Sequence, residues 1–254
     1  MTLLLASDEA APVIHERPAA ASPFLISCDH AGNLIPRSLG DLGVSPVDLA
    51  RHIAWDIGAL GVARHLVRLL DGELVAQRYS RLVIDCNRPP NSAELITTCS
   101  EATDIPGNRA LPLVAREARI SYIYAPYHHH LRAVLDTRAV NTRHTIFVAV
   151  HSFTPVYLGQ VRPWHVGVLS GNDRRLADPM LEYLRRHSEF CVGDNEPYRV
   201  DEKDYGIPVH ALARGLPHVL LEIRQDLIAQ AAGQRAWAQR LADVLSAARA
   251  VLKI

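Results

Sequence analysis

Short apolar runs alternate along the chain with segments of helical hydrophobic spacing, and this alternation predicts the fold. Apolar runs of strand length occupy residues 24–28, 73–77, 81–85, 145–150, 166–169 and 218–222. The run at 145–150 is apolar almost throughout, as expected of a strand buried on both faces of a parallel sheet. Strands that alternate with helices favour a largely parallel sheet covered by helices on both faces.

The segments between these strands have the apolar spacing or the capping residues of helices. We expect helices at residues 45–70, 111–141, 178–187, 208–214 and 227–252. Ser45 followed by Pro46 is typical of a helix start. This first helix either continues to Leu70 or restarts at Asp56, which would then be an N-cap. In the segment 111–141 we expect two helical pieces, the second starting at Pro126.

The remaining segments predict loops and a terminal arm. Residues 91–108 predict a long loop of the kind that covers active sites, and residues 192–208 predict an irregular segment. Residues 1–22 are rich in Ala and Pro and predict a flexible N-terminal arm. The expected organisation is therefore this arm followed by a single α/β domain at residues 23–254.

Composition narrows the class of protein. The chain has 254 residues, of which 48% are hydrophobic, so it can bury a sizeable core. Lys+Arg and Asp+Glu number 27 each, and this balance argues against a nucleic-acid or membrane-surface partner. No signal peptide is recognisable and no apolar run approaches the roughly 18 residues of a membrane span, so we expect a soluble, cytoplasmic protein. The cysteines are scattered without a C-x-x-C pair, which argues against a zinc ribbon or a disulfide framework.

Polar side chains follow several of the predicted strands at the point where each strand ends. They are Asp29-His30, Asp85-Cys86-Asn87-Arg88, His151-Ser152 and Glu222-Ile223-Arg224. In an open α/β sheet, ligands bind outside the carboxyl ends of the strands. We therefore expect these residues to form one site.

Two of these residues, His30 and His151, are suited to bind zinc. A catalytic zinc usually has three protein ligands and one open position. Asp56 is the candidate third ligand, with a helix N-cap as its alternative role. Asp29 is the second choice, either as a ligand or as a residue that orients a histidine. The predicted cofactor is Zn²⁺ or another divalent metal held by His30, Asp56 and His151.

The other strand-end residues suggest a base and a carboxylate-binding group. Glu222 could take a proton from water and pass it to a leaving nitrogen. Asn87, Arg88 and Arg224 could bind a substrate carboxylate, because a guanidinium binds carboxylates in a bidentate manner. A strand-end ion pair of Arg224 with Asp226 is the alternative for that arginine, and Arg88 could instead pair with Asp85.

Other interpretations remain open at this point. Cys28 or Ser152 could act as the nucleophile of a different hydrolase class, although no G-x-S-x-G motif surrounds Ser152. Arg81 is expected on the surface. The run His128-His129-His130 falls on a predicted helix, where consecutive side chains diverge, so we expect packing or solvent contact there rather than three ligands.

Several motifs in this order resemble the N-formylglutamate amidohydrolase family. They are Cys28-Asp29-His30-Ala31-Gly32-Asn33 with Ile35-Pro36, Tyr79-Ser80-Arg81-Leu82-Val83-Ile84-Asp85-Cys86-Asn87-Arg88-Pro89, His151-Ser152-Phe153, Asn195-Glu196-Pro197-Tyr198 and Leu221-Glu222-Ile223-Arg224-Gln225-Asp226. The family is similar in fold to zinc carboxypeptidases and aspartoacylases. The resemblance implies a three-layer α/β/α domain with a mixed sheet and a zinc-activated water, with His30 and His151 as ligands and Glu222 as general base. It also implies a role in histidine degradation.

One position departs from the carboxypeptidase pattern, because Asn33 stands where those peptidases have a glutamate ligand. The third ligand must then come from elsewhere, and Asp56 is our choice. The predicted function is metal-dependent hydrolysis of the amide bond of a small N-acyl amino acid, with N-formyl-L-glutamate as the leading substrate. A non-catalytic carboxylate-binding protein of the same fold is a further alternative.

Overall fold

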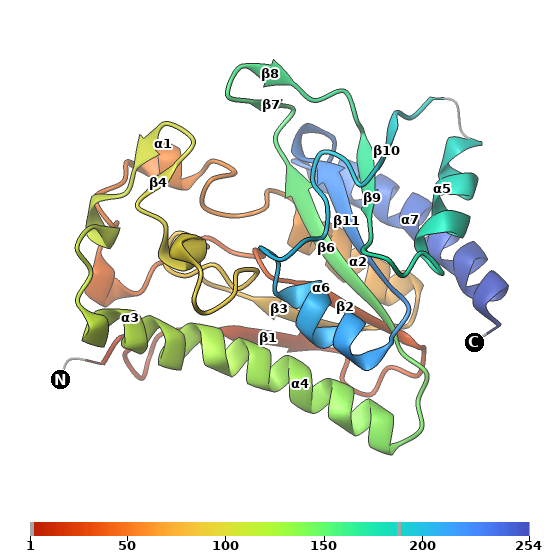
Figure 1. Cartoon of the computed structure of the whole chain (residues 1–254), viewed down its shortest axis with the longest axis horizontal. Coiled ribbons are helices and arrows are strands. Elements are labelled where there is room, and N and C mark those ends of the chain that lie inside the picture. Colours follow the sequence, from red (N-terminus) through yellow and green to blue (C-terminus); the bar gives the residue numbers. More distant parts are fainter. Residues whose placement is uncertain (1–2, 187–188, 254) are drawn as a thin grey trace.

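A mixed central sheet organises the molecule in the computed structural model, which describes residues 3–186 and 189–253. The sheet has seven strands in the order β1-β3-β2-β6-β11-β9-β10 (Figure 1). Its parallel centre consists of β3 (Glu73–Gln77), β2 (Phe24–Cys28), β6 (Ile146–Phe153) and β11 (His218–Arg224). The antiparallel pairings join β1 (Val13–Glu16) to β3 and β9 (Val166–Leu169) to β11, and β10 (Val192–Asp194) runs parallel to β9. The predicted mixed, largely parallel sheet is confirmed.

Helices cover both faces of this sheet and give three layers (Figure 1). One face packs against α2 (Ala59–Leu69), α5 (Ala177–Arg185) and α7 (Ala231–Leu252). The other packs against α3 (Leu113–Arg119), a π-helical turn (Ile120–Tyr124), α4 (Ala125–Val140) and α6 (Gly206–His210). Side chains alternate across the sheet, so Val148 of β6 faces the first core and Phe147 the second.

The helix starts show which local signals decided the structure. In α1 (Pro46–Leu49), the Ser45 hydroxyl accepts a hydrogen bond from the Asp48 amide at 3.1 Å, as an N-cap should. The helix does not continue to Leu70, because the chain turns and restarts as α2. The N-cap residue of α2 is Gly58 and not Asp56, so the alternative role considered for Asp56 is wrong.

Residues 81–85 were predicted as a strand, and this prediction is wrong. They form turns, in which the Val83 amide bonds the Ser80 carbonyl and the Asp85 amide bonds the Leu95 carbonyl. Leu82, Val83 and Ile84 are nevertheless almost fully buried against the α4 side of the sheet. A short apolar run reports burial, and burial alone does not distinguish a strand from a packed turn.

The N-terminal segment was predicted as a flexible arm outside the domain, and residues 13–16 contradict this. They form the edge strand β1, in register from Val13 opposite Gln77 to Glu16 opposite Leu74. Leu4 is also buried in the core on the α4 side. The alternation of apolar and polar residues over these four positions, in an Ala/Pro-rich context, is too weak to indicate a strand. The strand is defined by its hydrogen bonds to β3.

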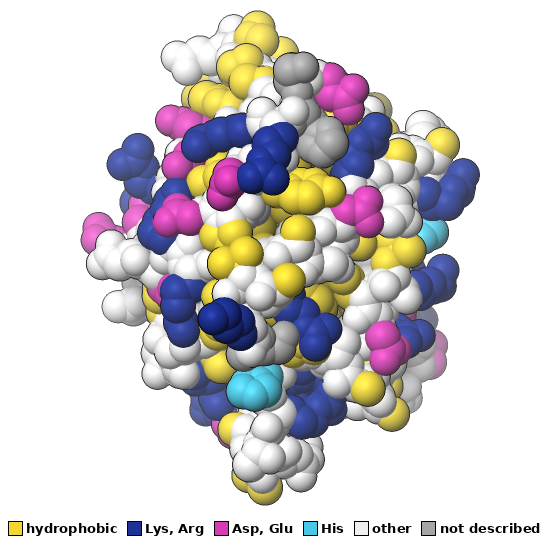
Figure 2. Space-filling view, turned by 90° about the vertical axis from the view of Figure 1, so that its right-hand side faces the viewer, with side chains coloured by type: hydrophobic (Ala, Val, Ile, Leu, Met, Phe, Trp, Pro, Cys, Tyr) yellow, Lys and Arg dark blue, Asp and Glu magenta, His cyan; other side chains and the backbone are white. Residues whose placement is uncertain are grey.

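Shorter elements complete the described chain. Two small hairpins, β4–β5 (Cys99–Ser100, Thr103–Asp104) and β7–β8 (Val156–Tyr157, Gln160–Val161), lie apart from the main sheet. Single 3₁₀ turns occur at Arg37–Leu39, Ala93–Ile96, Pro106–Asn108, Leu212–Arg214 and Gln225–Leu227. Within the described residues, no helix has the length and apolar character needed to cross a membrane. Figure 2 shows basic and acidic side chains interspersed over one face, in line with the balanced charge.

Candidate active site

A polar cavity of about 730 Å³ lies at the carboxyl ends of the central parallel strands. This is the place where open α/β sheets bind their ligands. Its walls include most of the residues singled out in the sequence: His30, Asp56, Asn87, Arg88, His151 and Glu222. Arg224 does not line the cavity.

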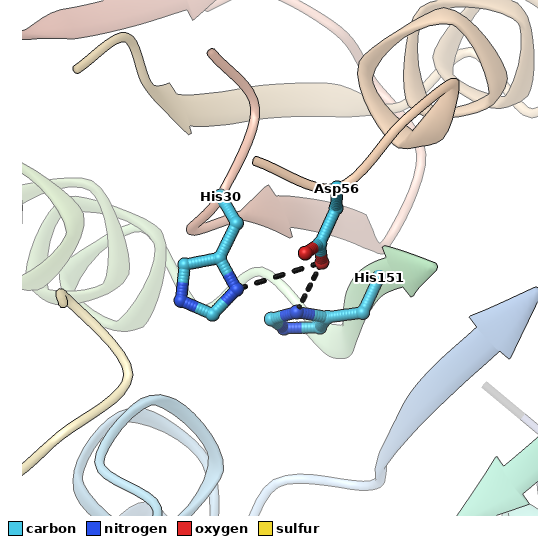
Figure 3. Close-up of side chains that lie close together, drawn as sticks. All are labelled: His30, Asp56 and His151. Carbon is cyan, nitrogen blue, oxygen red and sulfur yellow. Dashed lines mark hydrogen bonds and ion pairs between the residues drawn. The ribbon is translucent and has the colours of Figure 1, made fainter. Parts of the chain in front are cut away.

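His30, Asp56 and His151 converge within this cavity (Figure 3). The Oδ2 atom of Asp56 is 3.5 Å from Nδ1 of His30 and 2.9 Å from Nδ1 of His151. The two imidazole rings are 5.0 Å apart between centroids and inclined at 73°. All three residues are buried, with at most 3% of each exposed. The three residues predicted as metal ligands therefore occupy one place and each present a ligand-type atom to it.

The sheet itself places His151 beside Glu222. The parallel strands β6 and β11 pair these two residues directly, so their side chains stand next to each other on the same face. On the other side of β6, Ser27 of β2 pairs with Ala149, and two residues further on come Asp29 and His151. Parallel registry thus brings residues from distant parts of the sequence to one edge.

Asp56 reaches the site from a turn and not from a strand. Its amide donates to the His30 carbonyl at 2.9 Å, and its Oδ2 accepts from the Ser152 amide at 3.2 Å. Two residues later Gly58 has a φ of +81°, and a Cβ there would lie 2.2 Å from the Ile228 carbonyl oxygen. Only glycine suits this turn into α2, and the turn aims Asp56 at the two imidazoles.

The outer nitrogen of His30 has its own partner. Nε2 lies 2.7 Å from Oδ1 of Asp85, and Arg81 donates to Oδ2 of the same carboxylate at 2.7 Å. Burial opposes the ionisation of Asp85, but Arg81 and His30 together hold its pKa well below the usual value. When the His30 ring is neutral, Asp85 holds its proton on Nε2, so the lone pair stays on Nδ1, which has no hydrogen-bond partner.

Arg81 was expected on the surface, and this expectation is wrong. Its guanidinium lines the cavity and lies 3.6 Å from Asp56 in addition to its contact with Asp85. The signal available in the sequence was the i, i+4 spacing of Arg81 and Asp85 inside one motif.

Carboxylates dominate the electrostatics of the two imidazoles. Burial alone would lower the pKa of His151, but Asp29 and Asp56 outweigh burial and raise it well above the ordinary value. Burial and Arg81 likewise oppose protonation of His30, whose pKa is nevertheless raised by Asp85 and Asp56. Surroundings that favour a positive charge on the imidazoles would equally favour a divalent cation between them.

Glu222 differs from the other acids of the site. Burial raises the pKa of its carboxyl to about 7, although His151 acts in the opposite direction. Its Oε2 atom has no hydrogen-bond partner, and only 7% of the residue is exposed. A carboxyl with a pKa near neutrality can both accept and return a proton, as a general acid–base group must.

The predicted carboxylate-binding residues are only partly available. The Asn87 side chain donates to Asp204 and accepts from the amides of Tyr205 and Gly206, so it is engaged in holding that loop. Arg88 lines the cavity but pairs with Glu94 at 3.1 Å and with Asp204 at 3.5 Å. The alternative pairing of Arg88 with Asp85 is not formed.

Arg224 is the predicted site residue that the structure removes from the cavity. Its guanidinium pairs with Asp226 at 2.8 Å and bonds the Pro163 carbonyl. The strand-end ion pair considered as its alternative is therefore the correct one. Arg224 is the last residue of β11, and the 3₁₀ turn that follows it contains Asp226, its ion-pair partner.

The sequence did not predict the role of the loop around Tyr198. A Cβ on Gly167, which pairs with Glu222, would lie 2.0 Å from the Glu196 carbonyl oxygen, so this loop crosses directly over β9. Tyr198 consequently lines the cavity, and Arg162 donates to its hydroxyl at 2.8 Å. The Asn195-Glu196-Pro197-Tyr198 motif was the available signal.

The alternative nucleophiles fit poorly. Cys28 is fully buried beneath the sheet edge, and burial raises its thiol pKa well above the usual value, so it remains protonated. The Ser152 hydroxyl donates to the Ile57 carbonyl at 2.9 Å and has no base beside it among its hydrogen-bond partners.

In the run 128–130, His128 is buried, His129 is exposed and His130 packs on His15, so the prediction of packing and solvent contact is confirmed.

The mixed α/β/α fold and a buried acid–imidazole cluster at the strand ends define an α/β enzyme with a hydrolytic type of site. The model of the N-formylglutamate amidohydrolase family matches residues 22–229, and the chain belongs to that family. It is a hydrolase that acts on amide bonds.

Solved structures agree with this assignment. A gene product of Agrobacterium tumefaciens is 40% identical, with a TM-score of 0.96 over 99% of this chain and 100% of that one. An N-formylglutamate amidohydrolase from Ralstonia eutropha is 20% identical, with a TM-score of 0.74 over 96% of this chain and 99% of that one, which shows the shared fold. Among the curated proteins, the comparison found no match.

Proposed function

We propose that this protein is a metal-dependent amidohydrolase that cleaves N-formyl-L-glutamate into formate and glutamate. The observation that carries the proposal is the convergence of His30, Asp56 and His151 beside Glu222, whose Oε2 atom is buried without a hydrogen-bond partner. The family membership supports the substrate, because the relative from Ralstonia eutropha carries that activity in its name.

The donor set fits a zinc ion. Imidazole nitrogen and carboxylate oxygen are ordinary zinc ligands, and two ligands of a tetrahedral ion lie about 3.3 Å apart when each is at about 2.0–2.1 Å. The spacings of 3.5 Å and 2.9 Å from Asp56 Oδ2 to the two Nδ1 atoms are close to that value. Zinc in such a site supplies Lewis-acid polarisation of a carbonyl oxygen and acidifies water.

The residues of the chain then divide the work of amide hydrolysis. Glu222 takes the proton from the attacking water and delivers it to the amide nitrogen as the C–N bond breaks, so formate and the free amine leave together. Arg81 holds Asp85, and Asp85 holds His30. Arg88 exchanges its contact with Glu94 or Asp204 for a substrate carboxylate, because a guanidinium pairs with either in the same geometry.

The test is direct. The purified protein is analysed for metal and assayed for formate release from N-formyl-L-glutamate, before and after removal of metal by a chelator and after its return. We expect activity that disappears on chelation and returns with zinc. Activity that is unaffected by complete metal removal would contradict the metal-dependent mechanism. Metal-dependent activity on other N-acyl amino acids, with none on N-formyl-L-glutamate, would contradict the substrate alone.

A further inference from the structure

The imidazoles of His30 and His151 have similar surroundings, but of their two Nε2 atoms only that of His30 has a hydrogen-bond partner. Each histidine turns Nδ1 to Asp56. Nε2 of His30 meets Asp85 at 2.7 Å, whereas Nε2 of His151 faces Oδ2 of Asp29 at 3.6 Å and has no closer partner. A gap of 3.6 Å leaves no room for a water between the two atoms, so a small approach completes this contact.

Asp29 is itself fixed from behind. Its other carboxylate oxygen, Oδ1, accepts a hydrogen bond from the hydroxyl of Tyr127 on α4. Asp29 is 2% exposed and Tyr127 is fully buried, so water does not compete for these groups. A buried phenol that donates to a carboxylate aligns it and leaves its second oxygen for one further donor, the His151 ring.

We propose that Asp29 and Tyr127 form a positioning pair that keeps the proton of His151 on Nε2 and its lone pair on Nδ1. This inference rests on the proposed metal site. Asp85 performs the same task for His30, and Tyr127 takes for Asp29 the supporting position that Arg81 takes for Asp85.

The need for such a pair follows from the geometry of Asp56. Nδ1 of His151 is only 2.9 Å from Oδ2 of Asp56, a distance at which the neutral ring could equally donate its proton to that oxygen. In that tautomer Nδ1 would have no lone pair for a cation. A hydrogen-bond acceptor at Nε2 selects the other tautomer, which is the usual role of the groups behind metal-binding histidines.

The test compares zinc affinity among matched variants of the full-length protein. Competition with a chromogenic chelator gives the zinc dissociation constant of wild type, Asp29→Ala, Asp29→Asn and Tyr127→Phe. We expect Asp29→Ala to weaken binding about 10- to 100-fold, the range for loss of such outer partners, and Tyr127→Phe to weaken it less. Asp29→Asn retains an acceptor oxygen and should fall between Asp29→Ala and wild type.

Tyr79→Phe is the control for loss of a buried phenol. The Tyr79 hydroxyl donates to the Ala10 carbonyl at 2.7 Å, and Tyr79 does not line the cavity. It should leave the zinc dissociation constant unchanged. Tyr127→Phe and Asp29→Ala that bind zinc as tightly as Tyr79→Phe would overturn the inference and leave the proposed function intact. A wild-type protein that binds no zinc would overturn the proposed function and this inference with it.

A second measurement on the wild type does not depend on any variant folding. Long-range ¹H–¹⁵N spectra of the zinc-loaded protein report which ring nitrogen of each histidine carries the proton. We expect His30 and His151 both to carry it on Nε2, with imino protons that exchange slowly with solvent. In Tyr127→Phe the His151 imino proton should exchange faster while that of His30 is unchanged. A wild-type His151 protonated on Nδ1 would refute the positioning role.

Discussion

Among the residues that the structure describes, two pairs of buried histidines lie ring to ring, and they have opposite characters. His30 and His151 meet at the strand ends with ring centroids 5.0 Å apart, and His128 of α4 stacks on His210 of α6 at 5.2 Å. All four residues are at most 3% exposed. The first pair is surrounded by Asp29, Asp56 and Asp85, whereas Nδ1 of His128 bonds Nε2 of His210 and tyrosine rings pack around them.

The carboxylates and not the proximity of the imidazoles make the difference. Burial and the neighbouring ring lower the pKa of His128 to about 3, and burial lowers that of His210 to about 4, so this pair is neutral packing. Carboxylates raise the pKa of both His30 and His151 against the same burial. Two buried imidazoles therefore tolerate a positive charge only where acids compensate for the loss of water.

The largest difference between the two pairs should appear when one imidazole is removed from each. His151→Ala should abolish zinc binding and lower kcat/KM for N-formyl-L-glutamate by on the order of 10³-fold, because the several kcal/mol supplied by a metal are lost. His210→Gln should leave the zinc content unchanged. Metal analysis and formate-release kinetics of the two variants give both quantities. Equal zinc content in His151→Ala and wild type would remove the distinction between the pairs.

Replacement of Glu222, the acid beside the His30–His151 pair, should lower activity nearly as much. Glu222→Gln retains the shape of the side chain but cannot accept a proton, so kcat should fall about 10²- to 10⁴-fold. Zinc content should stay at the wild-type level because Glu222 is not one of the three converging residues. Steady-state kinetics with metal analysis checks this. A drop in zinc that accounts for the lost activity would make Glu222 a ligand instead of a base.

The His128–His210 pair should affect the stability of the folded protein and not its catalytic activity. Its folded-state pKa values lie below the value of about 6.5 for an unfolded histidine, so the unfolded chain binds more protons below that pH. The stabilisation is complete above about pH 6.5 and is lost as the pH falls toward 4. Between pH 7 and 5 we expect the pair to cost the protein about 2–4 kcal/mol of unfolding free energy.

Urea unfolding at pH 7 and pH 5 measures this loss. The double variant His128→Phe, His210→Leu lacks both imidazoles and should lose less unfolding free energy than wild type over the same interval. An identical pH dependence in the two proteins would mean that the stacked pair is not neutral in the folded state.

The smallest effects concern Arg88 and Arg224, which were both predicted from the sequence to bind a substrate carboxylate. Arg88→Met should raise KM and lower kcat/KM about 10- to 100-fold, since a hydrogen bond to a charged group contributes about 1.5–3 kcal/mol. Arg224→Met, the matched control, loses an ion pair with the half-exposed Asp226 and a bond to the Pro163 carbonyl, both outside the cavity, and should change kcat/KM less than about fivefold. Kinetics that rank the two variants in the reverse order would restore Arg224 to substrate binding.

Predictions from the sequence succeeded where the sheet fixes position. His151 and Glu222 were identified because each follows an apolar run, and the parallel pairing of β6 with β11 places them side by side. Asp56 was predicted as the third ligand with a helix N-cap as its alternative role, and a turn held by the His30 carbonyl brings it in. The predictions for residues 81–85 and for residues 13–16 were wrong. A pattern of apolar residues indicates which side chains are buried, but it does not show whether the segment forms hydrogen bonds with a neighbouring strand.

The sequence by itself determined the class of fold, the family and the set of acids and imidazoles at the strand ends. These follow from local periodicity and short motifs, which depend on neighbouring residues alone. Only the tertiary structure decided that Asp56 faces both imidazoles, that Asp29 and Tyr127 lie behind His151, that Arg81 belongs to the site and that Arg224 does not. These facts depend on contacts between residues far apart in the chain, and sheet registry and turn geometry fix such contacts without leaving a local pattern.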